Sequence, residues 1–126
     1  MKAATLARLV VDALEDVKAT NIRVLKVGEL TTITDYMIVA SGRSGRQVRA
    51  LAERVAEAAK QRGIRPLGIE GAETSEWILI DLGDVIVHAM QPATREFYQL
   101  EKLWEAPLQS AGSGVSRTST STPSRK

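Results

Sequence analysis

Residues 36–42 read Tyr36-Met37-Ile38-Val39-Ala40-Ser41-Gly42, and the fold class follows from this segment and from what comes after it. The first five residues are uncharged and rich in β-formers, which is typical of a strand buried on both faces. After Gly42 the apolar residues take helical spacing up to Gly63, which suits the left-handed position after a helix. The segment 66–70 is then a second strand, and the length of the crossover favours a parallel return to the same sheet. The sequence therefore predicts an α/β fold.

Three further segments complete the predicted sheet. Residues 22–27 mix apolar side chains with two basic ones and suit a short strand, near an edge because of those charges. Residues 77–81 and 85–90 are strands, and a two-residue turn at Gly83-Asp84 between them makes an antiparallel hairpin. The prediction is a single domain with a mixed β-sheet of about five strands, flanked by helices.

Helices are predicted at both ends of the folded region. Apolar residues recur at a spacing of three and four from Ala3 to Val17, which places them on one helical face. Pro92 suits the first turn of a last helix, because the donor that it lacks would be unpaired there. The residues predicted to face the sheet from that helix are Ala93, Phe97, Leu100 and Trp104. We assign residues 1–106 to the domain and residues 107–126, rich in Ser, Thr and Gly, to a disordered tail.

Composition excludes several classes of site and partner. The chain of 126 residues has no cysteine and one histidine, so disulfides, thiolate metal sites and histidine clusters are ruled out. Arg8 and Asp12 interrupt the N-terminal region before a signal-peptide core can form, and no run of 18 uncharged apolar residues occurs. We therefore expect a cytoplasmic protein with no membrane partner.

The net charge of +2 comes from the C-terminal end of the chain. Residues 105–126 hold three of the 17 basic residues but one of the 15 acidic residues, so residues 1–104 are electrically neutral. Nucleic-acid-binding domains usually concentrate basic residues on the folded surface. We therefore expect no specific nucleic-acid partner.

The predicted hairpin has two chemically different faces. With the turn at Gly83-Asp84, Trp77 pairs with Met90 at one end and Asp81 with Ile86 at the other. One face is uniformly aliphatic and suits packing under a helix; it consists of Ile78, Ile80, Leu82, Val85, Val87 and Ala89. The other face mixes aromatic, thioether, aliphatic and titratable groups; it consists of Trp77, Leu79, Asp81, Ile86, His88 and Met90.

Two interpretations of the mixed face stay open at this point. A sealed core rarely holds Asp and His, whereas a solvent-exposed face rarely holds Trp, Leu, Ile and Met, so the mixture suits a surface that a partner buries. Alternatively, the last helix covers this face, and Asp81 pairs with His88 or with a backbone donor.

Catalytic and anion-binding patterns are weak. Asp81 lies in a strand and Asp84 in the turn, so they are not the same-face carboxylate pair that a metal-dependent phosphoryl transfer needs. His88 has no serine or cysteine nucleophile suggested beside it. The free N–H groups and arginines of the loop at 40–46 could hold an anion, but the loop lacks the lysine of a phosphate loop and the third glycine of a dinucleotide fingerprint, so turn and cap chemistry is the favoured explanation. We predict no enzyme activity, no metal and no cofactor.

Four ordered segments resemble one known family. They are residues 33–42 (ITDYMIVASG), 65–71 (RPLGIEG), 77–88 (WILIDLGDVIVH) and 97–104 (FYQLEKLW). Their order and spacing are similar to those of the ribosomal silencing factor (Iojap-like) family, and the resemblance spans roughly residues 1 to 105. It implies an α/β sheet related in shape to nucleotidyltransferases but without their catalytic carboxylates.

The resemblance also implies a function. Such a protein docks on the large ribosomal subunit, through large-subunit ribosomal protein number fourteen, and obstructs joining of the small subunit by steric occlusion. A role in maturation of the large subunit is attributed to the family as well, and some members are homodimers. On this basis the mixed hairpin face is partner-facing, and the non-core side of the last helix adds Tyr98, Glu101 and Lys102. Two rival readings are a small nucleotidyltransferase and a scaffold that uses this face only for self-association.

Overall fold

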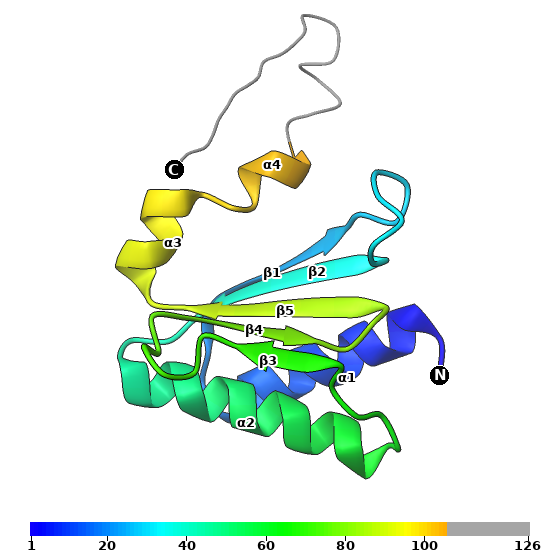
Figure 1. Ribbon diagram of the computed structural model, residues 1–126, viewed down its shortest axis with the longest axis horizontal. Coiled ribbons are helices and arrows are strands. Elements are labelled where there is room, and N and C mark those ends of the chain that lie inside the picture. The colour runs from blue at the N-terminus through cyan, green and yellow to red at the C-terminus, as the bar shows by residue number, and fades with distance from the viewer. Residues whose placement is uncertain (106–126) are drawn as a thin grey trace, which may run out of the picture.

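The computed structural model describes residues 1–105, so the predicted tail at 107–126 lies outside the described residues. In chain order the elements are α1 (Ala3–Asp16), β1 (Thr20–Lys26), β2 (Tyr36–Ser41), α2 (Gly45–Gln61), β3 (Gly68–Glu70), β4 (Trp77–Asp81), β5 (Val85–Met90), α3 (Pro92–Tyr98) and α4 (Lys102–Glu105). The five strands form one sheet in the order β1-β2-β5-β4-β3. Figure 1 shows α1 and α2 on one side of the sheet and the short α3 and α4 on the other.

The sheet is mixed, as the sequence predicts. β2 runs parallel to β5, while the pairs β1–β2, β4–β5 and β3–β4 are antiparallel. β3 therefore has the same direction as β2, and the predicted parallel return through α2 is confirmed. β3 is not the neighbour of β2, however, because β5 and β4 lie between them. The charged strand β1 is at an edge, also as predicted.

The two long helices bury their apolar faces on one side of the sheet. α1 contributes residues such as Leu6, Val10 and Leu14, and α2 contributes residues such as Val48, Leu51 and Val55, to one core cluster with β2, β4 and β5. The side chain of Ser44 caps α2 by accepting a hydrogen bond from the backbone N–H of Gln47 at 3.2 Å. The cap explanation of the 40–46 loop is thus confirmed. No helix among residues 1–105 is long and apolar enough to cross a membrane.

The C-terminal helix differs from the prediction. One continuous helix from Pro92 to Trp104 is wrong, because α3 ends at Tyr98 and Gln99 takes a left-handed conformation with φ of 48°. This reversal separates the residues that were expected to share one sheet-facing side. Ala93 and Phe97 are exposed, and Phe97 keeps 80% of its surface in solvent. Leu100 and Trp104, beyond the reversal, do pack against the sheet.

Candidate functional site

The β4–β5 hairpin has the predicted register. Trp77 pairs with Met90, Leu79 with His88 and Asp81 with Ile86. The pairing continues into the turn, where the N–H of Leu82 donates to the carbonyl of Val85 at 2.9 Å. Because side chains alternate along each strand, this register separates the two predicted faces. We call the aliphatic one the inner face and the mixed one the outer face.

The inner face is closed. All six of its residues, Ile78, Ile80, Leu82, Val85, Val87 and Ala89, are buried in the core cluster beneath α1 and α2. The outer face is instead only partly buried, and its side chains differ in exposure. Four of its residues are half-buried, namely Trp77, Leu79, Asp81 and Ile86. The other two are buried within the chain itself, His88 at 5% exposure and Met90 at 0%.

The Met90 end of the outer face is covered by the C-terminal segment. Leu100 and Trp104 pack against a second core cluster of buried residues, which consists of Leu25, Val27, Met37, Val39 and Met90. This packing matches the alternative interpretation, in which the last helix covers the mixed face, but only for this end. At the other end, Leu79 and Ile86 remain half-exposed.

Arg95 connects this C-terminal segment to the sheet. Its guanidinium forms an ion pair with Glu101 at 2.9 Å across the chain reversal at Gln99, and both side chains are largely buried. It also donates a hydrogen bond to the Ser41 hydroxyl at 2.9 Å. Burial alone would raise the pKa of the Glu101 carboxyl, but the hydrogen bond and the charge of Arg95 bring the pKa below its ordinary value. Glu101 is therefore a carboxylate that anchors α4 rather than a free surface charge.

An aromatic cluster lies on the outer face. The indole N–H of Trp77 donates to Nδ1 of His88 at 2.9 Å. The ring centroids of Tyr98 and Trp77 are 4.9 Å apart. Phe97 meets Tyr98 edge-on, also at 4.9 Å. Tyr98 is 54% exposed and Phe97 more so, so the cluster extends from the half-buried indole to the solvent. Trp77 of β4 and the two aromatic residues of α3 therefore form the exposed part of this cluster, and His88 of β5 lies beneath them.

His88 is a neutral imidazole at ordinary pH. Burial lowers the pKa of its side chain from 6.5 to about 4, because the charged form loses its hydration there. Since Nδ1 accepts the hydrogen bond from Trp77, the proton of the neutral ring is on Nε2. His88 therefore serves as a hydrogen-bond acceptor on this face.

The structure gives each predicted site residue a location. Trp77, His88 and Tyr98 come together in the aromatic cluster, with Leu79 and Ile86 beside it on the outer face. Asp81 accepts a hydrogen bond from the backbone N–H of Gly83 at 2.9 Å, so the expected backbone donor is confirmed. Lys102 is exposed on α4, whereas Met90 and Glu101 are occupied by contacts within the chain.

Sequence reasoning missed Phe97 as a surface residue. Its apolar character and its helical spacing with Leu100 and Trp104 placed it in the core. The reversal that exposes it occurs at a glutamine with positive φ, a conformation that glycine or asparagine would usually signal. The nearest available signal was the adjacent pair Phe97-Tyr98, since two neighbouring aromatic residues in a helix cannot both face the same sheet.

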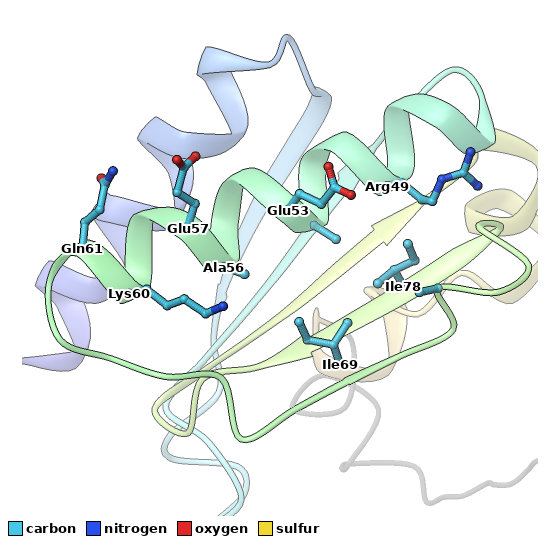
Figure 2. A pocket seen from close by; sticks show the side chains of 10 residues that line it. Arg49, Glu53, Ala56, Glu57, Lys60, Gln61, Ile69 and Ile78 are labelled. Atoms are coloured by element: carbon cyan, nitrogen blue, oxygen red, sulfur yellow. The ribbon is translucent and has the colours of Figure 1, made fainter.

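A groove of about 720 Å³ lies on the opposite side of the sheet, between α2 and β3. Figure 2 shows Ile69 and Ile78 pointing toward α2, while Glu53 and Glu57 point away from the strands. Its carboxylates therefore do not converge on one point. Among residues 1–105, moreover, no group of three or more His, Cys, Asp or Glu side chains is arranged to hold a metal ion.

The sequence and the fold both match those of known proteins. The family model described as "Ribosomal silencing factor during starvation" matches residues 1–126. The chain belongs to the ribosomal silencing factor family. A curated member from Chromobacterium violaceum is 42% identical over 117 residues, covering 93% of this chain and 96% of that protein. A second, from Bacillus subtilis, is 33% identical over 118 residues, with 93% and 100% covered.

A eukaryotic relative and a solved structure agree with this assignment. A mouse protein named "Mitochondrial assembly of ribosomal large subunit protein 1" is 34% identical over 99 residues, which cover 76% of this chain and 43% of the mouse protein. A crystal structure of a Chromobacterium violaceum protein superposes with a TM-score of 0.81 at 45% identity and covers 82% of this chain and 87% of that one. The predicted family and the predicted α/β fold are both confirmed.

Proposed function

We propose that the protein binds the large ribosomal subunit through the outer face and thereby blocks joining of the small subunit. Membership of the silencing factor family supports a ribosomal role, and the name of the mouse relative supports the large subunit as the target. The observation that carries the proposal is the half-exposed aromatic cluster of Trp77, Tyr98 and Phe97 on the side of the sheet that α1 and α2 leave uncovered.

Aromatic side chains at this location suit recognition better than folding. A soluble domain gains no stability from leaving 80% of a phenylalanine and 54% of a tyrosine in water. Protein interfaces, in contrast, concentrate their binding energy in tryptophan and tyrosine side chains that a partner desolvates. Half-burial of Trp77 holds the ring in place while part of its surface stays available to a partner.

The outer face divides into contacting and supporting residues under this proposal. Trp77, Leu79, Ile86 and Tyr98 contact the partner directly, and Asp81 and Lys102 supply charged groups at the margin. His88, Met90 and Glu101 support the surface from beneath, because they are occupied within the chain. The partner that we assign to this surface is large-subunit ribosomal protein number fourteen, as the family resemblance implies.

Steric occlusion requires no catalysis, so we propose that the protein is not an enzyme. We also propose that it acts in the cytoplasm. The diverging carboxylates of the α2 groove and the use of Asp81 in the turn support this view. The nucleotidyltransferase alternative predicts magnesium-dependent nucleotide binding. Calorimetric titration with ATP and Mg²⁺ tests it, and measurable heat of binding would favour that alternative.

Self-association through the same aromatic surface is the second alternative. If dimer and partner compete for one surface, dilution to monomer should leave affinity for the large subunit intact or improve it. If the surface serves only the dimer, the monomer should not bind subunits at all. Sedimentation velocity over a dilution series, with and without large subunits, distinguishes the two cases.

Sedimentation with separated ribosomal subunits tests the proposal itself. The purified protein is mixed with large subunits, with small subunits, or with both at moderate salt, and each mixture is resolved on a sucrose gradient. We expect the protein to travel with the large subunit alone and the yield of whole ribosomes to fall. A protein that stays at the top of every gradient would refute the proposal.

A further inference from the structure

We infer that His88 is a positioning residue for Trp77, whose indole it holds in the orientation that the partner meets. This inference rests on the proposed function, in which Trp77 contacts the partner directly. His88 itself is 5% exposed, so it offers the partner almost no surface. Its contribution to binding is therefore indirect and passes through the hydrogen bond to Trp77.

The hydrogen bond is the central observation. The indole Nε1–H of Trp77 donates to Nδ1 of His88 at 2.9 Å, and the ring centroids are 5.9 Å apart. The two residues are not a directly opposed pair, because His88 lies opposite Leu79 and Trp77 lies opposite Met90. The contact therefore fixes the indole diagonally across the hairpin, toward the centre of the outer face.

This bond is the only hydrogen bond of the imidazole among residues 1–105. The other ring nitrogen, Nε2, is buried and has no partner in that part of the chain. A buried polar group without a partner carries a desolvation cost, which apolar packing alone would avoid. An aliphatic or aromatic residue would fill the space without that cost, so packing does not explain a histidine here. The hydrogen bond that Nδ1 accepts from the indole N–H explains why a histidine occupies this position.

Two further contacts complete the placement of Trp77. The ring of Tyr98 lies against the indole at 4.9 Å, with the ring planes tilted by 51°. The backbone of Gly71, with φ of 91°, lies close to the start of β4, and a Cβ at this position would collide with the carbonyl oxygen of Trp77, so only glycine fits there. The indole is thus held by the hydrogen bond at Nε1 and by the ring contact with Tyr98. A side chain held in its bound orientation loses less conformational entropy on association, which favours affinity.

Two substitutions separate positioning from packing. His88→Asn leaves a cavity but places an amide oxygen close to where Nδ1 accepts, whereas His88→Phe keeps a ring of similar size and removes the acceptor. If the acceptor matters, the asparagine variant should behave like the natural protein and the phenylalanine variant should not. If only packing matters, the order should be reversed.

The test combines NMR with subunit affinity. The chain has two tryptophans, so the indole N–H resonance that disappears in Trp77→Phe belongs to Trp77. We expect His88→Phe to move this resonance, to make its exchange with solvent fast and to lower affinity for large subunits about tenfold. We expect His88→Asn to retain slow exchange and to keep affinity within about threefold. Thermal unfolding of both variants verifies that each is folded.

Several results would overturn the inference. One is a phenylalanine variant that keeps both the resonance and the affinity; another is an asparagine variant that loses affinity more than the phenylalanine variant does. A moved resonance with unchanged affinity would also refute it, since orientation would then not matter. A natural chain that fails to bind large subunits would refute the proposed function, while the indole resonance would still report on the hydrogen bond.

Discussion

The inner and outer faces of the β4–β5 hairpin are built from the same strands, yet they behave differently. The inner face carries six aliphatic side chains, all buried under α1 and α2. The outer face alternates with it residue by residue but carries a tryptophan, an aspartate and a histidine, and four of its six side chains are half-exposed. One closed face is enough to hold these strands in the core. The other face is then free to carry aromatic and titratable side chains that stay partly exposed.

The outer face is itself divided into a covered part and an open part. At the Met90 end, Leu100 and Trp104 cover it, and the Arg95–Glu101 ion pair holds them there. At the Leu79 and Ile86 end, the surface stays open. Trp77 packs against the covered cluster and, through Tyr98 and Phe97, also belongs to the exposed aromatic surface. Under the proposed function, the partner therefore binds at the boundary between a covered and an open region.

The largest expected effect contrasts two neighbouring residues on opposite faces. Ile80→Ala should lower the free energy of unfolding by about 4 kcal/mol, because Ile80 is fully buried and the substitution leaves a cavity. Leu79→Ala, on the half-exposed outer face, should cost about 1 kcal/mol. Urea denaturation measures both. Equal losses would contradict the division of the hairpin into a structural and a recognition face.

Acidification should reveal the buried histidine of the outer face. The unfolded chain binds a proton at His88 near pH 6.5, but burial lowers the pKa in the folded protein to about 4. The unfolded state thus binds more protons between these values, and stability falls as the pH drops through this window. The free energy of unfolding should decrease by about 3 kcal/mol between pH 7 and pH 4. About 2 kcal/mol of this decrease should occur between pH 7 and pH 5.

Denaturation at several pH values measures this decrease, with His88→Phe as the control. That variant has no imidazole, so its stability should vary little between pH 7 and pH 5. If the variant and the natural chain lose stability in parallel over this range, another group would be responsible for the titration.

Loss of the aromatic anchor should weaken binding without unfolding the protein. Trp77→Ala should reduce affinity for the large subunit by about 2 kcal/mol, which is roughly 30-fold. The matched control is Leu67→Ala, since Leu67 is 75% exposed but precedes the edge strand β3 and has no part in the aromatic cluster. Filter binding or sedimentation measures both affinities. Similar weakening by the two variants would indicate a nonspecific effect of losing apolar surface.

The smallest expected effect concerns the covered end of the outer face. Glu101→Gln keeps the shape of the side chain but removes the charge that pairs with Arg95, and stability should fall by about 1 kcal/mol. Glu96→Gln, an exposed neighbour on α3, is the control and should change stability little. Urea denaturation compares the two. A cost equal to that of the control would mean that the ion pair does not hold α4 on the sheet.

The fold was predictable wherever a local pattern determines it. The two-residue turn sets the hairpin register, and side-chain alternation then assigns Ile80 to one face and Leu79 to the other. The crossover length predicts that β3 is parallel to β2, but not how many strands lie between them, because that depends on which edges meet in three dimensions. The sequence alone therefore predicts strand direction better than strand order.

The candidate site was predictable in composition but not in detail. Alternation identified all six outer-face residues, yet it could not show that Met90 is covered by Trp104 within the same chain. The reversal at Gln99 has no strong local signal, so Phe97 was assigned to the core. The bond from Trp77 to His88 runs diagonally between residues that are not paired in the register, and only side-chain geometry reveals it.

Ribosome formation from purified subunits, in the presence of increasing protein, tests directly whether the outer face occludes subunit joining. With large subunits held at a concentration below the dissociation constant, Leu67→Ala should inhibit at the same protein concentration as the natural chain, and Trp77→Ala should require roughly 30 times more protein. Equal potency of Trp77→Ala and the natural chain, with both bound to the large subunit, would contradict the claim and assign the occlusion to another surface.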